Sequence, residues 1–378
     1  MNHSDELLEI WVARYLPNFG EISNSVRHHV EQRLQNAIAI PARQATAHKI
    51  KRHLASDCAS ASAETKDLFI EMGTAINSWE LKNLTPKVYQ LYETLITCYE
   101  RSFIFSPILE HLHTIDSEVG RLQAAALVIP EFESLLLTMS PMLNELKAVY
   151  FSSVTNRHLI GFMTTHIHFT RQHILSHLNL DETIWLTTYL QLLDELICMP
   201  WQKICSVLAS TGQRPELLAL VKKMMPKVNA ISTLTYQKAL RTYPTHISCQ
   251  GRIQSAPVQR SSLRDLSMFQ AYIWLSVLED STAVVERKLL PICLQVFPLT
   301  KVDWEMVIFA IQTIVDLIEQ QLTQAENVLF SRQAQKIQAL FLNNRPKMTQ
   351  VPLLKEQLQL KNSLENVSYT WKPSPGLG

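Results

Sequence analysis

Glycine is scarce in this sequence, with only 8 residues in a chain of 378. Because proteins usually contain about 7% glycine, this scarcity disfavours folds that depend on tight turns and glycine-rich phosphate-binding loops. The chain also contains no GxGxxG fingerprint, no GxxxxGKS/T loop and no GxSxG elbow. Conventional nucleotide-binding and hydrolytic enzymes are therefore unsupported, and the balance favours a protein that is not an enzyme, with an atypical helical active site left open.

A large excess of either charge is also missing. The chain has 35 Lys and Arg against 34 Asp and Glu, so its formal net charge is +1. This excludes the global positive charge of many nucleic-acid-binding proteins, although a local basic patch stays open.

Cysteine pairs and long apolar runs are absent as well. The six cysteines form no CxxC pair, and in a chain of this length they are typical of reduced thiols. The first residues lack a basic segment followed by an apolar run, so we expect no secretory signal. No stretch reaches the ~18 uncharged apolar residues of a membrane span, and the strongest, 307–318, contains Asp316. We predict a soluble cytoplasmic protein.

What the sequence does contain is helical periodicity. Between Asp303 and Leu322, apolar residues recur at steps of three and four, which places them on one helical stripe. Thr85 followed by Pro86, and Asp181 followed by an apolar stripe that Pro200 ends, indicate two further helices. Comparable patterns cover residues 24–38, 42–56, 64–78, 108–126, 131–149, 155–178, 201–210, 214–241, 263–279, 283–295 and 326–342.

Strand signals are missing, because no Asn-Gly or Asp-Gly pair occurs anywhere in the chain. We therefore predict an all-α fold, a compact bundle of roughly a dozen or more helices without significant sheet. The polar stretch around Gly251 lacks a helical stripe and contains two prolines, which indicates a long exposed loop. The predicted division is an N-terminal basic helical segment (1–60), a main helical bundle (61–243), an exposed basic loop (244–262), C-terminal helices that pack on the bundle (263–343) and a C-terminal extension with a flexible end (344–378).

Charge is segregated along the C-terminal half. No acidic residue occurs between Leu217 and Arg264, whereas nine acidic residues lie between Asp265 and Glu326. Our main hypothesis is a scaffold, adaptor or regulatory protein whose basic loop and adjacent helices bind an acidic protein partner. The residues predicted to bind this partner are Lys222, Lys223, Lys227, Arg241, Arg252, Arg260 and Arg264. Two alternatives stay open: the basic and acidic faces screen each other within the monomer, or the basic patch serves a nucleic-acid-binding regulator.

Three histidines of the segment 155–178 suggest a different class of function. His166, His173 and His177 lie on one narrow stripe at helical spacing, and His168 points to the opposite, polar side. Neutral imidazole is a common metal ligand, so a metal ion, or haem or another tetrapyrrole, is the alternative to the scaffold hypothesis, which needs no cofactor. The competing interpretation is that these are boundary histidines satisfied by backbone or water. Partner identity and oligomeric state are not predicted.

Overall fold

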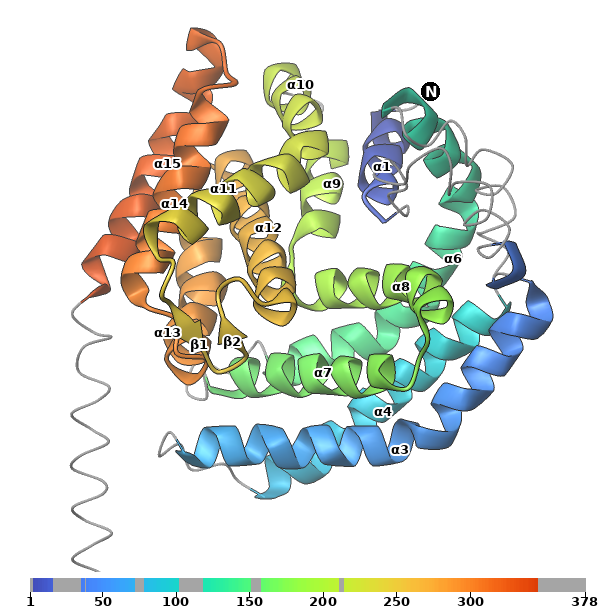
Figure 1. The fold of residues 1–378 in the computed structure, drawn as a ribbon. Coiled ribbons are helices and arrows are strands. Elements are labelled where there is room, and N and C mark those ends of the chain that lie inside the picture. Colours follow the sequence, from blue (N-terminus) through green and yellow to red (C-terminus); the bar gives the residue numbers. More distant parts are fainter. Residues whose placement is uncertain are drawn as a thin grey trace, which may run out of the picture.

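The computed structural model describes residues 3–15, 35–37, 39–71, 78–101, 118–150, 158–210 and 214–345. These residues form thirteen α-helices, a short 3₁₀-helix, a π-helix and one hairpin of two-residue strands (Figure 1). The prediction of an all-α fold without significant sheet is confirmed.

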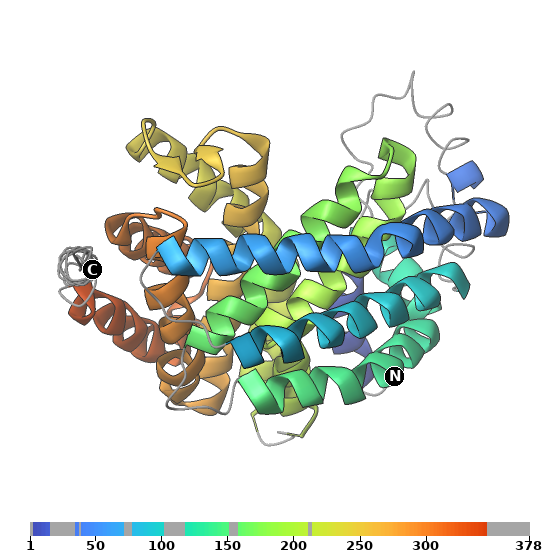
Figure 2. The ribbon, with the colours of Figure 1, turned by 90° about the horizontal axis from the view of Figure 1, so that it is seen from below.

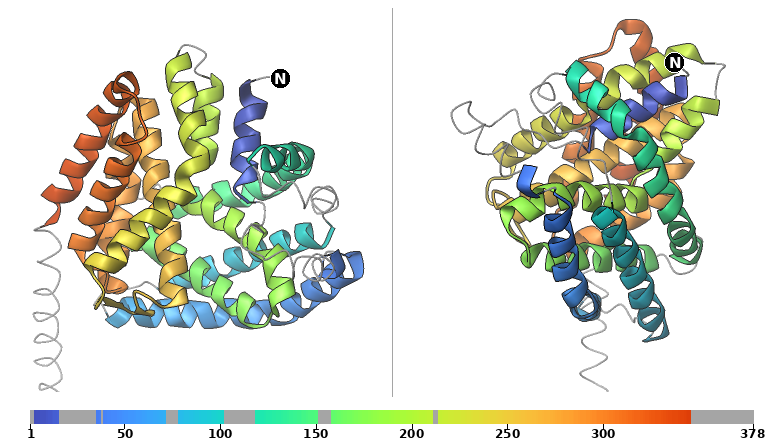
Figure 3. Two further views of the ribbon diagram at one scale, coloured as in Figure 1. Left: turned by 45° about the horizontal axis from the view of Figure 1, so that its top comes forward. Right: turned by 90° about the vertical axis from the view of Figure 1, so that its right-hand side faces the viewer.

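The first six helices form one side of the molecule. The long helices α3 and α4 pack side by side, and α7 packs against α3 (Figures 1 and 2). The short helix α1 lies against α6 and α9 (Figure 3). Their bounds are α1 His3–Ala13, α3 Ile40–Glu71, α4 Ser78–Arg101, α6 Glu118–Tyr150, α7 His158–Ser176 and α8 Leu180–Cys198.

The remaining helices surround α12. Every residue of α12 from 266 to 278 is buried, because α9, α11, α14 and α15 all pack against this helix. The bounds are α9 Trp201–Ser210, α10 Pro215–Met224, the 3₁₀-helix Met225–Lys227, α11 Val228–Thr242, β1 Ile247–Ser248, β2 Gly251–Arg252, α12 Ala256–Glu279, the π-helix Val285–Leu289, α13 Leu290–Leu299, α14 Trp304–Glu319 and α15 Gln324–Asn343.

Local capping chemistry sets several helix ends. Asp303 caps α14 by accepting a hydrogen bond from the Glu305 N–H at 3.0 Å. Asn179 and Glu182 form a capping box at the start of α8, which ends just before Pro200 as predicted. The stop at Pro200 turns the chain into α9 and places the buried Trp201 beside α8.

One predicted helix start is wrong, and one predicted domain boundary falls inside a helix. The structure places Pro86 inside α4, which begins at Ser78, and the Thr85 hydroxyl donates a hydrogen bond to Ser62 Oγ at 3.0 Å instead of capping a helix. The predicted boundary at 60/61 falls inside the continuous helix α3, because the Ala- and Ser-rich stretch 57–63 stays helical. The predicted helix 24–38 and the C-terminal extension 344–378 lie almost entirely outside the described residues.

The predicted long loop 244–262 is also corrected. Residues 247–252 form a hairpin, in which Gly251 has a φ of +117° that favours glycine. Helix α12 then begins at Ala256, with Pro257 in its first turn, where the missing proline N–H costs nothing. Tyr236 of α11 donates a hydrogen bond to the Ile253 carbonyl at 2.6 Å and ties the hairpin to the helices. Of the two prolines that were interpreted as loop signals, Pro257 therefore lies in the first turn of a helix.

One segment of the described residues, Leu122–Ala148 in α6, is long and apolar enough to cross a membrane by length and composition, and a third of its most apolar window is buried in the fold. This segment does not meet the criterion of an uncharged apolar run that was applied to the sequence, because it contains Glu131 and Glu133.

Candidate functional site

A cavity of about 180 Å³ lies between the two sides of the molecule. Helices α7 and α8 with Leu68 of α3 form one wall, and the hairpin with α11, α12, α13 and α14 forms most of the rest. Most of the lining side chains are apolar, among them Phe269, Phe297 and Met306. Helix α12 contributes both apolar and charged side chains to this space, because it is the central helix of its half.

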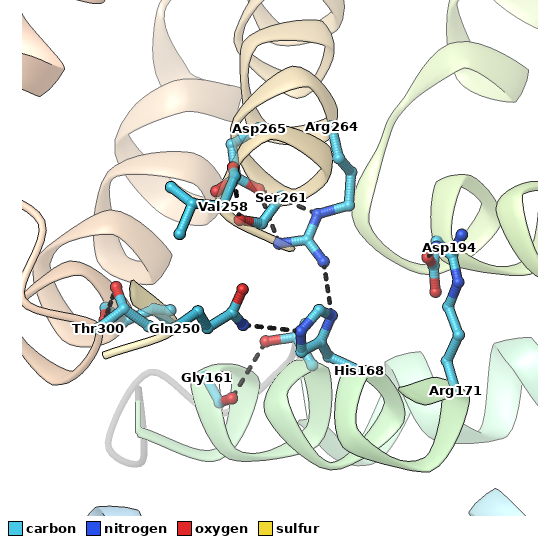
Figure 4. Close-up of polar contacts among 12 residues, drawn as sticks. Gly161, His168, Arg171, Asp194, Gln250, Val258, Ser261, Arg264, Asp265 and Thr300 are labelled. Atoms are coloured by element: carbon cyan, nitrogen blue, oxygen red, sulfur yellow. Dashed lines mark hydrogen bonds and ion pairs between the residues drawn. The ribbon is translucent and has the colours of Figure 1, made fainter. Parts of the chain in front are cut away.

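The polar end of the cavity is built around Arg264 of α12 (Figure 4). Arg264 donates two hydrogen bonds to Asp265 Oδ1, from Nε at 3.0 Å and from Nη2 at 2.8 Å. Its Nη1 donates to Nδ1 of His168 on α7 at 3.1 Å. Arg171 of α7 forms an ion pair with Asp194 of α8 beside this cluster. Arg264, Asp265 and Asp194 thus line one end of an apolar cavity, and Arg171 pairs with Asp194 from outside the lining.

His168 is held neutral at this site. Burial, with smaller contributions from the charges of Arg264, Arg171 and Arg260, lowers the pKa of His168 to about 3. Because Nδ1 accepts from Arg264, the ring proton of neutral His168 sits on Nε2, and the side-chain amides of Gln250 and Gln172 lie 3.0 Å and 2.9 Å from this nitrogen. One of these amides accepts the proton through its oxygen. The Gln250 amide, which reaches into the cavity from the hairpin, therefore belongs to the hydrogen-bond network of His168.

Two cysteine thiols line the same cavity. Burial raises the pKa of Cys198 on α8 to about 12, so this thiol stays protonated and unreactive. Cys249 sits in the hairpin turn, where its N–H donates to the Thr300 carbonyl at 3.0 Å, and its side chain is exposed. Since Cys249 both lines the cavity and is exposed, the cavity reaches solvent beside the hairpin turn.

The predicted partner-binding residues divide into two groups. Arg264 is not a free cation of an exposed loop, because it belongs to α12 and is bound to Asp265 and His168. Lys223 pairs with Glu326 at 2.7 Å, and Lys222 also has an interaction partner. The remaining residues make no ion pair within the described part of the chain, namely Lys227, Arg241, Arg252 and Arg260.

The three predicted metal-binding histidines lie on one face of α7, but they do not converge on a common ligand. His173 Nε2 contacts Glu64 at 2.8 Å and His177 Nε2 contacts Asp57 at 2.9 Å, so both pair with carboxylates of α3. His166 is fully buried, and burial lowers its pKa to about 4. Within the described residues no group of three or more His, Cys, Asp or Glu side chains is placed to hold a metal ion. These histidines form a contact between two helices.

Sequence reasoning missed His168, Gln250 and Asp194. The helical wheel places His168 on the polar side of α7, and the structure shows that this side faces the cavity instead of open solvent. No spacing in the sequence connects these residues, because Arg264 lies 96 positions after His168. The one sequence feature that points to this site is the run 217–264 without acidic residues, because it ends at Arg264.

Residues 201–342 match the family model of phycobilisome proteins. The match covers α9 to α14, the hairpin and nearly all of α15, and so it includes most of the cavity wall. Helices α7 and α8, with His168 and Asp194, lie outside the matched span. No curated protein and no solved structure matches the chain.

The phycobilisome-like helical domain bears on the two hypotheses for the function of this chain, the scaffold and the tetrapyrrole-binding protein. It supports the tetrapyrrole alternative better than the scaffold hypothesis, since a phycobilisome protein domain suggests a bilin chromophore. The predicted histidine stripe is not part of this domain. If a tetrapyrrole binds, the cavity residues are the better candidates for its site.

Proposed function

We propose that this chain is a phycobilisome protein that binds a bilin, an open-chain tetrapyrrole, in the cavity between α7, α8 and the phycobilisome-like domain. One observation carries the proposal. In the cavity wall formed by the matched span, the exposed thiol of Cys249 accompanies the partly buried ion pair of Arg264 and Asp265. A bound bilin would supply absorption of visible light.

The donor set suits such a group. Apolar walls accommodate pyrrole rings, carboxylates accept hydrogen bonds from pyrrole N–H groups, and guanidinium groups bind propionates. Asp265 and Asp194 would accept hydrogen bonds from the pyrrole N–H groups, and Arg264 would bind a propionate. Neutral His168 keeps the Arg264 guanidinium in place without adding positive charge.

The size of the cavity sets a condition on binding. At about 180 Å³ the cavity is smaller than the ~300–1,000 Å³ typical of small-molecule sites. A whole tetrapyrrole therefore requires the hairpin 247–252, which closes one side, to move outward. The Cys249 thiol, carried by this hairpin, would be the residue that holds the bilin covalently.

The proposal includes assembly with other phycobilisome subunits at the cytoplasmic face of thylakoid membranes. It retains the cytoplasmic location predicted from the sequence and replaces the unnamed acidic partner with a subunit of that assembly. The match of residues 201–342 supports this placement.

The test is binding of a purified bilin to the full chain. Phycocyanobilin added in stoichiometric amounts should give a protein-bound absorption band in the red, and the denatured protein should keep the pigment. Cys249→Ser should abolish the pigment that survives denaturation, and Arg264→Gln should weaken binding itself by about tenfold, the loss of one charge-assisted contact.

Cys98→Ser is the matched control, because Cys98 lies on α4 away from this cavity. It should keep both the band and the attached pigment. A full chain that binds no bilin by absorption or fluorescence titration would refute the proposal.

A further inference from the structure

The hairpin side of the molecule carries cations that the chain does not neutralise. Lys238 and Arg241 on α11, Arg252 on β2 and Arg260 in the first turns of α12 are exposed. None of these four side chains forms an ion pair or hydrogen bond within the described residues. We call these residues the basic face. In Figure 2 the hairpin and the adjoining ends of α11 and α12 project from the body of the molecule.

No acidic residue pairs with these four side chains within the described part of the chain. Five of the nine acidic residues between Asp265 and Glu326 pair with other cations, and two of these five pairs join the basic stretch to the acidic one. The pairs are Asp265–Arg264, Glu279–Lys203, Asp280–Arg332, Glu305–Arg345 and Glu326–Lys223. The positive charge of the basic face is therefore left for an external anion.

Two exposed apolar side chains accompany the cations. Leu234 is 45% exposed and shares one stripe of α11 with Lys238 and Arg241, at spacings of four and seven residues. Ile247 is 59% exposed and lies directly opposite Arg252 in the hairpin, so both side chains lie on the same side of the strands. Apolar groups beside guanidinium groups are typical of protein interfaces, whereas contacts with nucleic-acid backbone are mainly polar.

We propose that the basic face docks an acidic surface of a partner protein. Charge steers the encounter, and Leu234 and Ile247 supply apolar contact once the surfaces meet. A second copy of this chain is the competing occupant, and the sedimentation measurement below tests it. The proposal does not rest on bilin binding, since the basic face lies on the outer surface and the bilin is assigned to the cavity.

The experiment measures binding of the full chain to two probes, poly-L-glutamate and a panel of purified phycobilisome subunits of net negative charge. The triple variant Arg241→Glu, Arg252→Glu, Arg260→Glu should raise Kd at least tenfold for poly-L-glutamate and for any subunit that binds. The double variant Leu234→Ser, Ile247→Ser should weaken subunit binding severalfold and leave poly-L-glutamate binding unchanged, because the homopolymer offers no apolar surface.

The matched control is the triple variant Arg52→Glu, Lys66→Glu, Lys82→Glu. It changes the net charge by the same amount as the test variant, at exposed residues of α3 and α4. It should keep the affinity of the wild-type chain, and circular dichroism should confirm that all variants stay helical. Equal loss in control and test variants would overturn the proposal. So would tighter binding of a 20-base-pair DNA duplex, or a dimer in sedimentation that the triple variant dissolves. If poly-L-glutamate behaves as expected but no subunit binds, docking stands and assembly into a phycobilisome fails.

Discussion

His168 lies where burial and three nearby arginines all oppose a positive charge, and this makes the stability of the protein depend on pH. The unfolded chain binds a proton at this histidine below about pH 6.5, whereas in the folded chain the pKa is about 3. Stability is therefore lost as the pH falls through this window, and at pH 5 the loss from this residue is about 2 kcal/mol. Urea unfolding at pH 7 and pH 5 measures it, and His168→Gln should reduce the difference by that amount.

Glutamine is the informative replacement because its side-chain oxygen still accepts a hydrogen bond from Arg264. Burial also lowers the pKa of His166, to about 4, and contributes a loss of the same sign in wild type and variant alike. The comparison therefore isolates His168. An unchanged difference between pH 7 and pH 5 in the glutamine variant would show that His168 is already charged in the folded protein at pH 5.

Single residues also show what the sequence could predict of the site. Helical spacing correctly placed His166, His173 and His177 on one face, because spacing depends only on local geometry. Their carboxylate partners are 109 residues away for His173 and 120 for His177, and no local rule connects such positions. The same limit hid the pairing of His168 with Arg264. The chemistry of each residue could be read from the sequence, but the contacts depend on packing.

At the scale of elements, α1 is attached through a buried polar network. Arg14, just after α1, contacts Glu195 of α8 at 3.4 Å, and Tyr15 donates to the same carboxylate at 2.6 Å. The Arg14 guanidinium also lies 4.7 Å from the centre of the Trp201 ring. Glu195→Gln leaves Arg14 buried without a counterion, which should cost about 3–5 kcal/mol. We expect hydrogen exchange of the α1 amides to accelerate accordingly.

A second variant separates charge from packing at this contact. Arg14→Met together with Glu195→Gln removes both charges and keeps most of the side-chain volume, so α1 should recover much of its protection. If the double variant exchanges as fast as Glu195→Gln alone, the ion pair is not what holds α1 in place.

Helix ends show which elements the sequence specifies locally. The start of α14 could be placed from the apolar stripe that begins at Asp303, and Asp303 itself caps the helix by a contact two residues along the chain. The start of α4 could not be placed, because Thr85 is occupied by a contact with Ser62 of α3 and the helix continues through Pro86. Periodicity therefore locates a helix, whereas the residue that caps it depends on the contacts that the fold makes.

At the scale of the whole molecule, the phycobilisome-like domain depends on helices outside the matched span. Gly161 of α7 lets the helix approach α13 closely, since an added Cβ would lie 3.2 Å from the Val296 side chain. Trp201 at the start of α9 is buried with α1 packed nearby, and α7 and α8 close the cavity. Three surfaces of the domain are therefore covered by residues before position 201.

This dependence predicts how the domain behaves when it is made alone. A fragment of residues 201–345 keeps α12 with its neighbours α9, α11, α14 and α15, so far-UV circular dichroism should still show helix. In this fragment α7 no longer covers α13, α1 no longer packs near Trp201, and α7 and α8 no longer close the cavity. Apolar surface that is buried in the full chain therefore becomes exposed. We expect strong binding of the dye ANS and a broad thermal transition, against weak binding and a sharp transition for the full chain. Adding residues 1–200 in trans should suppress the dye signal if the two parts recombine. A fragment that melts sharply and binds no dye would show instead that the matched span folds independently, and that the first 200 residues serve the cavity without supporting the domain.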